Sequence, residues 1–262
     1  MEDIVVRETK GPVHWIRLNR PEIRNAICRE SAQLALTALK QCENEGARVV
    51  VLTGSGGSFC SGADLKAAEF DIADPTETAT SVLVKAYHPL ALAITGSPIP
   101  VIAAVDGVAA GVGSDLALAC DIRLASDRAV FTEIFVQLGL IPDGGGTYTL
   151  PRLIGSGRAM EMVMTGRKVS AAEALAWGLV SFVYPAAQFD DQVQAYAERL
   201  AAKAPVALAR SKEAIRQSWE VASFEEALTK EGAIQKELFG TQDFIEGVTA
   251  FFEKRPPQFQ GR

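Results

Sequence analysis

Aspartates in glycine-rich turns are the side chains of this sequence best suited to chemistry. Asp143 stands between an Ile-Pro pair and the run Gly-Gly-Gly-Thr at residues 144–147. A carboxyl group there can act as a general acid or base when its pKa lies near the working pH. An Asp at the start of a helix is also a common N-cap. The local pattern leaves both interpretations open for Asp143, and equally for Asp64 and Asp115.

Nucleophilic and metal chemistry have little support in the sequence. There is no Gly-x-Ser-x-Gly motif, and Cys60 has no histidine close to it, since the only two histidines are His14 and His88. The four cysteines lack the spacing of a metal site. In a chain of this size we expect them to be free thiols in a reducing compartment. Carboxylates therefore remain the candidate acid/base groups.

Three glycine-rich turns lie at residues 54–62, 107–113 and 144–146. None has the spacing of a phosphate-binding loop or of a dinucleotide-binding fingerprint. A turn of small residues that opens a helix offers bare backbone N–H groups to an anion. Two such turns facing one point would form an oxyanion hole for a carbonyl oxygen that gains negative charge. Taken singly, each turn could equally be a tight strand-to-helix connection.

The hydrophobic pattern predicts an α/β fold that positions these turns. Residues 48–53 and 100–105 are short apolar runs, typical of strands buried on both faces of a parallel sheet. Val13–Leu18 fits an edge strand or a hairpin. Further elements are expected as a strand at 122–125 and helices at 31–45, 78–95, 187–203, 205–219 and 223–239. From Ser156 onward the pattern is almost purely helical, with capping boxes at Ser170 and Ser223, so the C-terminal third is expected to have no sheet of its own.

Composition limits the class of protein. The 262 residues are 48% hydrophobic and 22% charged with a net charge of −6, which excludes intrinsic disorder. The most apolar stretch, 101–119, is interrupted by Asp106 and Asp115, so no membrane span is expected. An acidic balance without a basic run argues against nucleic-acid binding. The N-terminal segment lacks the apolar core of a signal peptide, and we expect a cytoplasmic protein.

Five separated motifs carry a family resemblance. Residues 58–65 are Ser-Phe-Cys-Ser-Gly-Ala-Asp-Leu, and residues 138–147 are Leu-Gly-Leu-Ile-Pro-Asp-Gly-Gly-Gly-Thr. Between them, residues 100–121 are Pro-Val-Ile-Ala-Ala-Val-Asp-Gly-Val-Ala-Ala-Gly-Val-Gly-Ser-Asp-Leu-Ala-Leu-Ala-Cys-Asp. Asn-Arg-Pro at 19–21 with Asn-Ala at 25–26, and Ala-Leu-Ala-Trp-Gly-Leu-Val at 174–180, fit as well. Together they resemble the crotonase superfamily, the enoyl-CoA hydratase/isomerases, from about residue 4 to residue 260.

The resemblance implies a fold and an assembly. The family fold is a spiral of ββα turns, expected here as an acyl-CoA-binding core over residues 1–195. A helical region over residues 196–262 would build a homotrimer or a homohexamer. No metal or redox cofactor is implied, because coenzyme A is part of the substrate. The implied partner is an acyl-CoA, with no nucleic acid and no membrane.

The resemblance also implies where the substrate binds. The backbone N–H groups of Ala63 and Val112 would form the oxyanion hole around the thioester carbonyl. Val112 replaces the usual glycine, but the role belongs to the amide and survives if the backbone geometry does. The coenzyme A adenine is expected near Asp64 and Leu65. The residues implied in substrate binding are Arg24, Ala26, Ser61, Asp64, Leu65, Gly111 and Phe135.

The acid/base residues separate the activities within the family. Hydratases use two glutamates; the first aligns with Asp115 and the second with Phe135, so the second carboxylate is missing. Glu133 lies two residues away and is expected to point elsewhere, unless a local shift brings it in. Asp143 occupies the position of the single catalytic acid of the isomerases. These include the ring-epoxide isomerase of phenylacetate breakdown, which is closest over residues 138–145. An apolar pocket with Phe135 would raise the pKa of Asp143.

Several alternatives stay open. Asp115 with Asp143 or Glu133 could hold a water, as in a hydratase, or Asp115 could simply cap a helix beginning near Gly113. His88 with Asp143 matches in part the pair of the 4-chlorobenzoyl-CoA dehalogenases, or His88 is a helix-surface residue near the pocket mouth. A non-enzymatic family member is a further alternative. The leading hypothesis is an isomerase of straight-chain or aromatic acyl-CoA with Asp143 as its acid/base.

Overall fold

A six-stranded sheet forms the centre of the computed structural model, which describes residues 3–67, 70–71 and 73–262. The strand order is β1-β2-β3-β4-β6-β9, antiparallel between β1 and β2 and parallel elsewhere. The strands are β1 (Val5–Lys10), β2 (Val13–Leu18), β3 (Val49–Gly54), β4 (Val101–Val105), β6 (Ile122–Ser126) and β9 (Phe182–Tyr184). Every residue of β3 and β4 is buried, as expected for strands covered on both faces.

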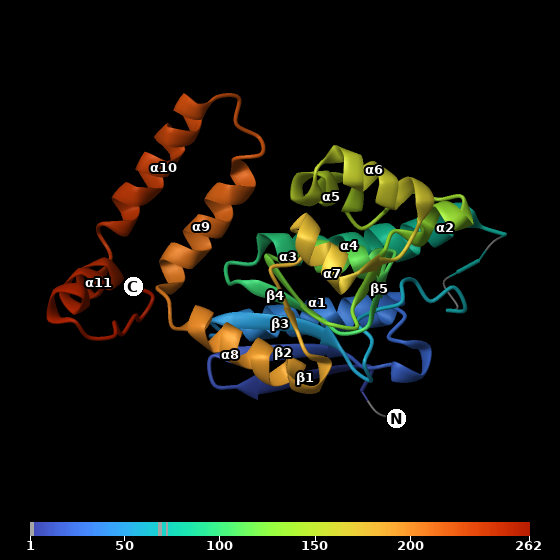
Figure 1. Cartoon of the computed structure of the whole chain (residues 1–262), viewed down its shortest axis with the longest axis horizontal. Helices are drawn as coiled ribbons and strands as arrows, with labels where there is room; N and C mark the ends of the chain where they lie inside the picture. The colour runs from blue at the N-terminus through green and yellow to red at the C-terminus, as the bar shows by residue number, and fades with distance from the viewer. Residues whose placement is uncertain (1–2, 68–69, 72) are drawn as a thin grey trace.

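The described helices cover both faces of this sheet (Figure 1). They are α1 (Arg29–Asn44), α2 (Pro75–Ala79), the π-helical segment η2 (Thr80–Tyr87), α3 (His88–Gly96), α4 (Val112–Ala119), α5 (Gly146–Ile154), α6 (Ser156–Thr165), α7 (Ala171–Trp177), α8 (Phe189–Ala201), α9 (Pro205–Gln217), α10 (Phe224–Leu238) and α11 (Gln242–Glu253). Short 3₁₀ turns stand at Pro21–Ile23, Ile134–Leu138 and Ala186–Gln188. None of the described helices combines the length and apolar character that crossing a membrane requires.

Alternate residues of the central strands enter two separate cores. Val50 of β3 and Ala103 of β4 pack with α1 and α3 on one side, whereas Val49 and Ile102 pack against α8 on the other. This two-residue period follows from strand geometry. The sheet is therefore held from both faces, and the turns at the carboxyl ends of its strands start from a rigid support.

A second, three-stranded sheet carries one of the glycine-rich turns. It has the order β5-β7-β8, with β5 (Val108–Ala110) parallel to β7 (Val130–Thr132) and β7 antiparallel to β8 (Val169–Ser170). Strand β5 runs directly into α4 through Gly111. The chain thus alternates between the two sheets with a helix after each turn, which is the expected spiral of ββα units.

Three expected elements differ in detail from the structure. Val13–Leu18 forms a hairpin with β1, which is one of the two predicted alternatives, and it is not an edge strand because β3 pairs with its other side. The chain after Ser156 is helical apart from the short strands β8 and β9, and as expected it forms no sheet of its own, because these two strands join the two sheets of the core. Strands of two or three residues are too short to show a period in the sequence. The helix expected at 78–95 runs from α2 to α3, with eight π-helical residues in its middle.

Helices α9, α10 and α11 extend away from the sheets as an arm (Figure 1). The expected boundary at residues 195/196 falls within α8, whose Ala197 and Ala201 still pack on the sheet. The arm therefore begins after α8. Apolar side chains are exposed along it, namely Phe224, Leu228, Phe239, Ile245, Phe251 and Phe252.

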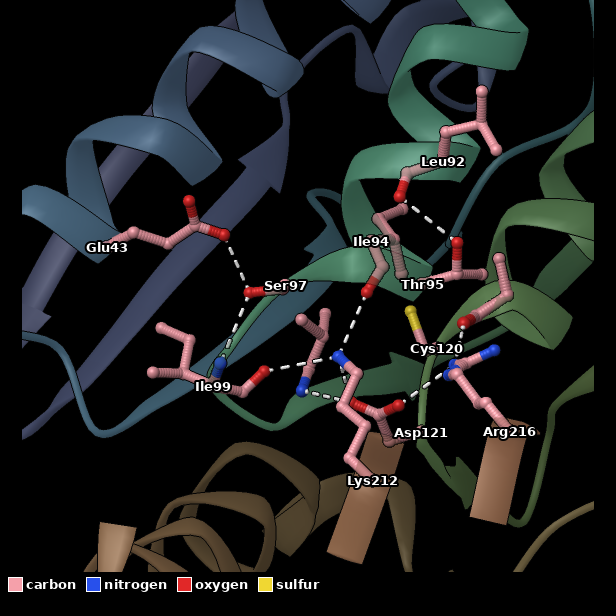
Figure 2. Close-up of polar contacts among 12 residues, drawn as sticks. Glu43, Leu92, Ile94, Thr95, Ser97, Ile99, Cys120, Asp121, Lys212 and Arg216 are labelled. Atoms are coloured by element: carbon pink, nitrogen blue, oxygen red, sulfur yellow. Dashed lines mark hydrogen bonds and ion pairs between the residues drawn. The ribbon is translucent and has the colours of Figure 1, made fainter. Parts of the chain in front are cut away.

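Polar contacts of α9 fasten the arm to the core (Figure 2). Lys212 Nζ donates to the carbonyl oxygens of Ile94 (3.0 Å) and Ile99 (3.3 Å) and lies 2.8 Å from Asp121 Oδ2. Arg216 donates to the other carboxylate oxygen of Asp121 at 2.9 Å. Since Lys212 is largely buried, desolvation lowers its pKa and the charge of Asp121 opposes that change.

The four cysteines are free.

Candidate active site

A cavity of about 670 Å³ opens where the two sheets, α2–η2 and the loop before α5 come together. Its wall is mostly apolar, and Val82, Leu83, Phe135 and Leu138 contribute to it. Of the expected site residues it is lined by Ser61, Ala63, Leu65, Gly111, Val112, Phe135 and Asp143. Segments that are 80 residues apart in sequence thus meet at one place.

The loop after β3 turns the amide of Ala63 toward the cavity. Ile27 donates to the carbonyl of Gly62 at 2.8 Å and accepts from the N–H of Asp64 at 2.9 Å. Ile27 and Ala63 form a parallel bridge, in which Ile27 bonds to Gly62 and Asp64 on either side of Ala63. The backbone N–H and C=O of Ala63 therefore point away from Ile27. Gly62 has φ of +104°, a conformation that glycine adopts without strain.

The second amide begins helix α4. Gly111 has φ of +52° and donates to the Thr132 carbonyl at 2.9 Å, and the next residue, Val112, is the first of the helix. The first N–H groups of a helix have no acceptor within it and lie at the positive end of its dipole. The valine side chain is buried, and the amide is left at the cavity that Ala63 also lines. Replacement of the usual glycine therefore preserves the backbone turn.

Asp143 lies on the loop before α5 and lines the same cavity. Its Oδ1 is buried and has no hydrogen-bond partner among the described residues. Burial raises the pKa of this carboxyl to about 6, and the charge of His88 acts in the opposite direction. The N-cap of α5 is Gly145, so the helix-cap interpretation of Asp143 is wrong. His88 is exposed, and its Nε2 lies 2.9 Å from the backbone oxygen of Asp143.

Asp115 and Glu133 do not line the cavity. Asp115 is buried within the first turn of α4, whose N-cap is Gly111, so the cap interpretation of Asp115 is wrong as well. Its Oδ2 accepts the N–H of Gly144 at 2.7 Å. Burial, with a smaller effect of the Asp143 charge, raises the pKa of Asp115 to about 7.

Glu133 is fully buried. Its pKa is raised well above the usual range, first by burial and then by the charge of Asp115, while the hydroxyl of Ser114 acts in the opposite direction. It does not line the cavity, yet its carboxyl lies within electrostatic reach of both Asp115 and Asp143. At position 135 itself the cavity wall is the ring of Phe135.

Of the expected binding residues on the segments around Arg24 and Asp64, only Ser61 and Leu65 line the cavity. The backbone oxygen of Arg24 accepts the N–H of Ser61 at 3.0 Å. Arg24 lies in a left-handed turn with φ of +54°. Asp64 forms an ion pair of 2.8 Å with Arg20, and Arg20 also donates to the carbonyl of Ala26 at 3.0 Å.

Arg20 and the α2 and η2 residues of the cavity wall were not among the predicted site residues. Val82 and Tyr87 of η2 line the cavity, and the Tyr87 hydroxyl donates to the Ile27 carbonyl at 2.8 Å. The only available signal was the apolar character of residues 82–90. A π-helical segment shifts its side chains out of the usual helical period, so no amphipathic stripe marks the face toward the cavity.

The fold and this site define an acyl-CoA enzyme of the crotonase type. The enoyl-CoA hydratase/isomerase family model matches residues 8–262, and the chain belongs to that family. It is 42% identical over 94% of both chains to a probable enoyl-CoA hydratase of Rhodobacter capsulatus. It is 40% identical over the whole of both chains to the 1,2-epoxyphenylacetyl-CoA isomerase of Escherichia coli.

Solved structures agree with this assignment. An enoyl-CoA hydratase of Bacillus anthracis superposes with a TM-score of 0.92 at 36% identity and covers 99% of this chain and 100% of its own. An enoyl-CoA hydratase of Polaromonas superposes with a TM-score of 0.93 at 34% identity, over 98% of this chain and 99% of its own. The crotonase fold expected from the motifs is thereby confirmed.

Proposed function

We propose that this protein is an acyl-CoA isomerase in which Asp143 is the single acid/base. The observation that carries the proposal is that Ala63, Val112 and Asp143 all line one apolar cavity. The cavity wall at position 135 is a phenyl ring, where a hydratase would need its second carboxylate. An isomerisation needs only one group that takes a proton from one carbon and returns it to another.

The proposed reaction begins with the thioester carbonyl oxygen between the two amides. The ionised carboxylate of Asp143 takes a proton from the carbon next to the carbonyl, and the electron pair of that C–H bond moves toward the carbonyl oxygen. The resulting enolate is stabilised by both N–H groups, each worth about 3 kcal/mol in comparable sites. Asp143 then returns the same proton to another carbon of the acyl chain. Atoms and charge balance without any further reactant.

The acyl group is proposed to be apolar, straight-chain or aromatic. The isomerase of Escherichia coli acts, by its name, on an epoxide of phenylacetyl-CoA, and the apolar cavity of about 670 Å³ here is large enough for an aromatic acyl group. We further propose that the exposed apolar residues of α10 and α11 are covered by other copies of the chain in a homotrimer or homohexamer. Phe251 and Phe252 are prominent among them.

A hydratase is the second candidate, because relatives carry that name and two further buried carboxyls, Asp115 and Glu133, lie behind the cavity wall. It would require one of them to reach a water inside the cavity. The dehalogenase alternative has less support, since the ring of His88 contacts the backbone oxygen of Asp143 and not its carboxylate.

The test follows the absorbance of the conjugated thioester with purified protein. A 3-enoyl-CoA should give an increase, and Asp143→Asn should abolish it while the variant still binds acyl-CoA. Full turnover by Asp143→Asn would refute the assignment. A loss of absorbance with crotonyl-CoA would show addition of water and favour the hydratase.

A further inference from the structure

The loop that carries Asp143 is built around the side chain of Asp115. Asp115 Oδ2 accepts the N–H of Gly144 at 2.7 Å, directly after Asp143 in sequence. The backbone N–H groups of Asp143 and Gly146 also act on this carboxylate and lower its pKa against the effect of burial. Three amides of one short loop thus surround a single carboxylate that belongs to another element, α4.

The glycines of this loop are explained by the same contact. A Cβ on Gly144 would lie 2.7 Å from Asp115 Cβ, and a Cβ on Gly146 would lie 2.0 Å from Asp115 Oδ1. Real Cβ atoms essentially never approach other heavy atoms so closely. Neither position can carry a side chain while Asp115 stays in place, and neither glycine has a positive φ that would require it for other reasons. The loop and Asp115 are therefore fitted to each other.

Asp115 is separated from the substrate by the loop that it holds. Asp143 lines the cavity, whereas Asp115 does not and is only 1% exposed. Its remaining oxygen, Oδ1, has no hydrogen-bond partner among the described residues. A carboxylate that already accepts a short hydrogen bond, behind the cavity wall, is poorly placed to exchange protons with an acyl chain.

We propose that Asp115 is a positioning residue, whose carboxylate holds the 143–146 loop and thereby fixes the Asp143 side chain against the oxyanion hole. This inference rests on the proposed role of Asp143. The role proposed for Asp115 differs from that of the aligned hydratase glutamate, because that glutamate acts directly on water and Asp115 acts only on the loop. In this chain the contribution of Asp115 to turnover is made through the hydrogen bond to Gly144.

The charged and titratable groups around this contact are few. Glu133, in the segment after β7, lies within reach of the charge of Asp115, and the Ser114 hydroxyl acts on Glu133. Asp143 also acts on Asp115, and the imidazole of His88 on α3 acts on Asp143. Burial, and to a smaller extent the charge of Asp143, raises the pKa of Asp115 to about 7, whereas the pKa of Asp143 is about 6, so Asp115 is largely protonated when Asp143 ionises. Replacing Asp115 by a neutral amide that keeps the acceptor must therefore leave the pKa that Asp143 shows in the pH profile nearly unchanged.

The decisive comparison is between Asp115→Asn and Asp115→Ala. Asparagine keeps an oxygen for Gly144 and places its nitrogen where Oδ1 now has no partner. We expect Asp115→Asn to retain about a third or more of the wild-type kcat, with the acid limb of the profile near its wild-type position. Asp115→Ala leaves the Gly144 N–H without its acceptor, so kcat should fall roughly 10- to 100-fold with little change in KM. Ser114→Ala, equally buried on α4, is the matched control and should keep wild-type kcat.

Each outcome decides the proposal. An equal loss in both Asp115 variants would overturn it and make Asp115 a proton-transferring group. Wild-type kcat in Asp115→Ala would overturn it too, because no positioning would be needed. If Asp115→Ala does not fold, retention or loss of turnover by Asp115→Asn alone supports or overturns it. Asp143→Asn is measured alongside: turnover by that variant refutes the proposed function itself, whatever the Asp115 variants do.

Discussion

Gly62→Ala tests whether the turn before Ala63 sets the oxyanion hole. At Gly62 φ is +104°, and an added Cβ would lie 3.1 Å from the backbone oxygen of Ala110. That oxygen belongs to the peptide just before Gly111, so the new methyl group presses the two glycine turns apart. Both amides of the proposed oxyanion hole should move as a result, because each directly follows one of these glycines.

The expected loss can be estimated from the two effects of the methyl group. The backbone strain of a non-glycine residue at such a φ is about 1–3 kcal/mol, which should appear as lower stability. Complete removal of one oxyanion donor lowers kcat by about 100- to 1000-fold, so a displacement of a few tenths of an ångström should lower it roughly 10- to 100-fold. KM should change less, since the donors act mainly on the charge that develops in the transition state.

The assay is steady-state turnover of a 3-enoyl-CoA, with thermal unfolding measured on the same samples. Gly11→Ala is the matched control, because Gly11 has φ of +60° and an added Cβ would meet nothing within 4 Å. Gly11 lies in the β1–β2 turn, and its variant should lose stability but keep kcat. A folded Gly62→Ala with unchanged kcat would refute the argument that this turn places the Ala63 amide.

Three further predictions concern pH, the arm and the assembly. Since Asp143 must be ionised to take a proton, kcat/KM should rise with pH through a midpoint at its pKa of about 6. His88→Gln should move that midpoint upward, because it removes a charge that lowers the pKa of Asp143. The pH profiles of the wild type and of the variant check both predictions. Lys212→Met leaves Asp121 with a single cation, and urea unfolding should show a loss of about 1–3 kcal/mol. Phe251→Asp should reduce the molar mass measured by light scattering if α11 lies in a subunit interface.

The fold was predictable from the sequence where apolar runs are long. Residues 48–53 and 100–105 predict β3 and β4 almost to the residue, since such strands are buried on both faces. The capping box at Ser170 is also present as expected, with the Ser170 side chain accepting the N–H of Glu173. Strands β5, β7, β8 and β9 have two or three residues each, and their pairing comes from tertiary contacts that leave no period to detect.

The site was predictable only in part. The motifs located Ala63, Val112, Phe135 and Asp143, and the structure brings these together at one cavity. The gapless register predicts that Glu133 does not take the place of the second hydratase carboxylate, and in the structure Glu133 does not line the cavity. Its burial within reach of the charge of Asp115 comes from tertiary contacts that the register does not contain.

Glycine runs that look alike in the sequence exist for different physical reasons. Gly62 and Gly111 adopt positive φ and turn the following amide toward the cavity. Gly144 and Gly146 have ordinary backbone angles, and they are glycines because Asp115 occupies the space of their side chains. The conformations of Gly62 and Gly111 therefore do not depend on Asp115. Alanine at position 144 or 146 would fit only if residue 115 were smaller. For this reason Gly144→Ala should lower the thermal stability of the wild-type chain, and it should lower it less when combined with Asp115→Gly. Thermal unfolding of the single and double variants measures both losses. Equal losses in both backgrounds would contradict the explanation.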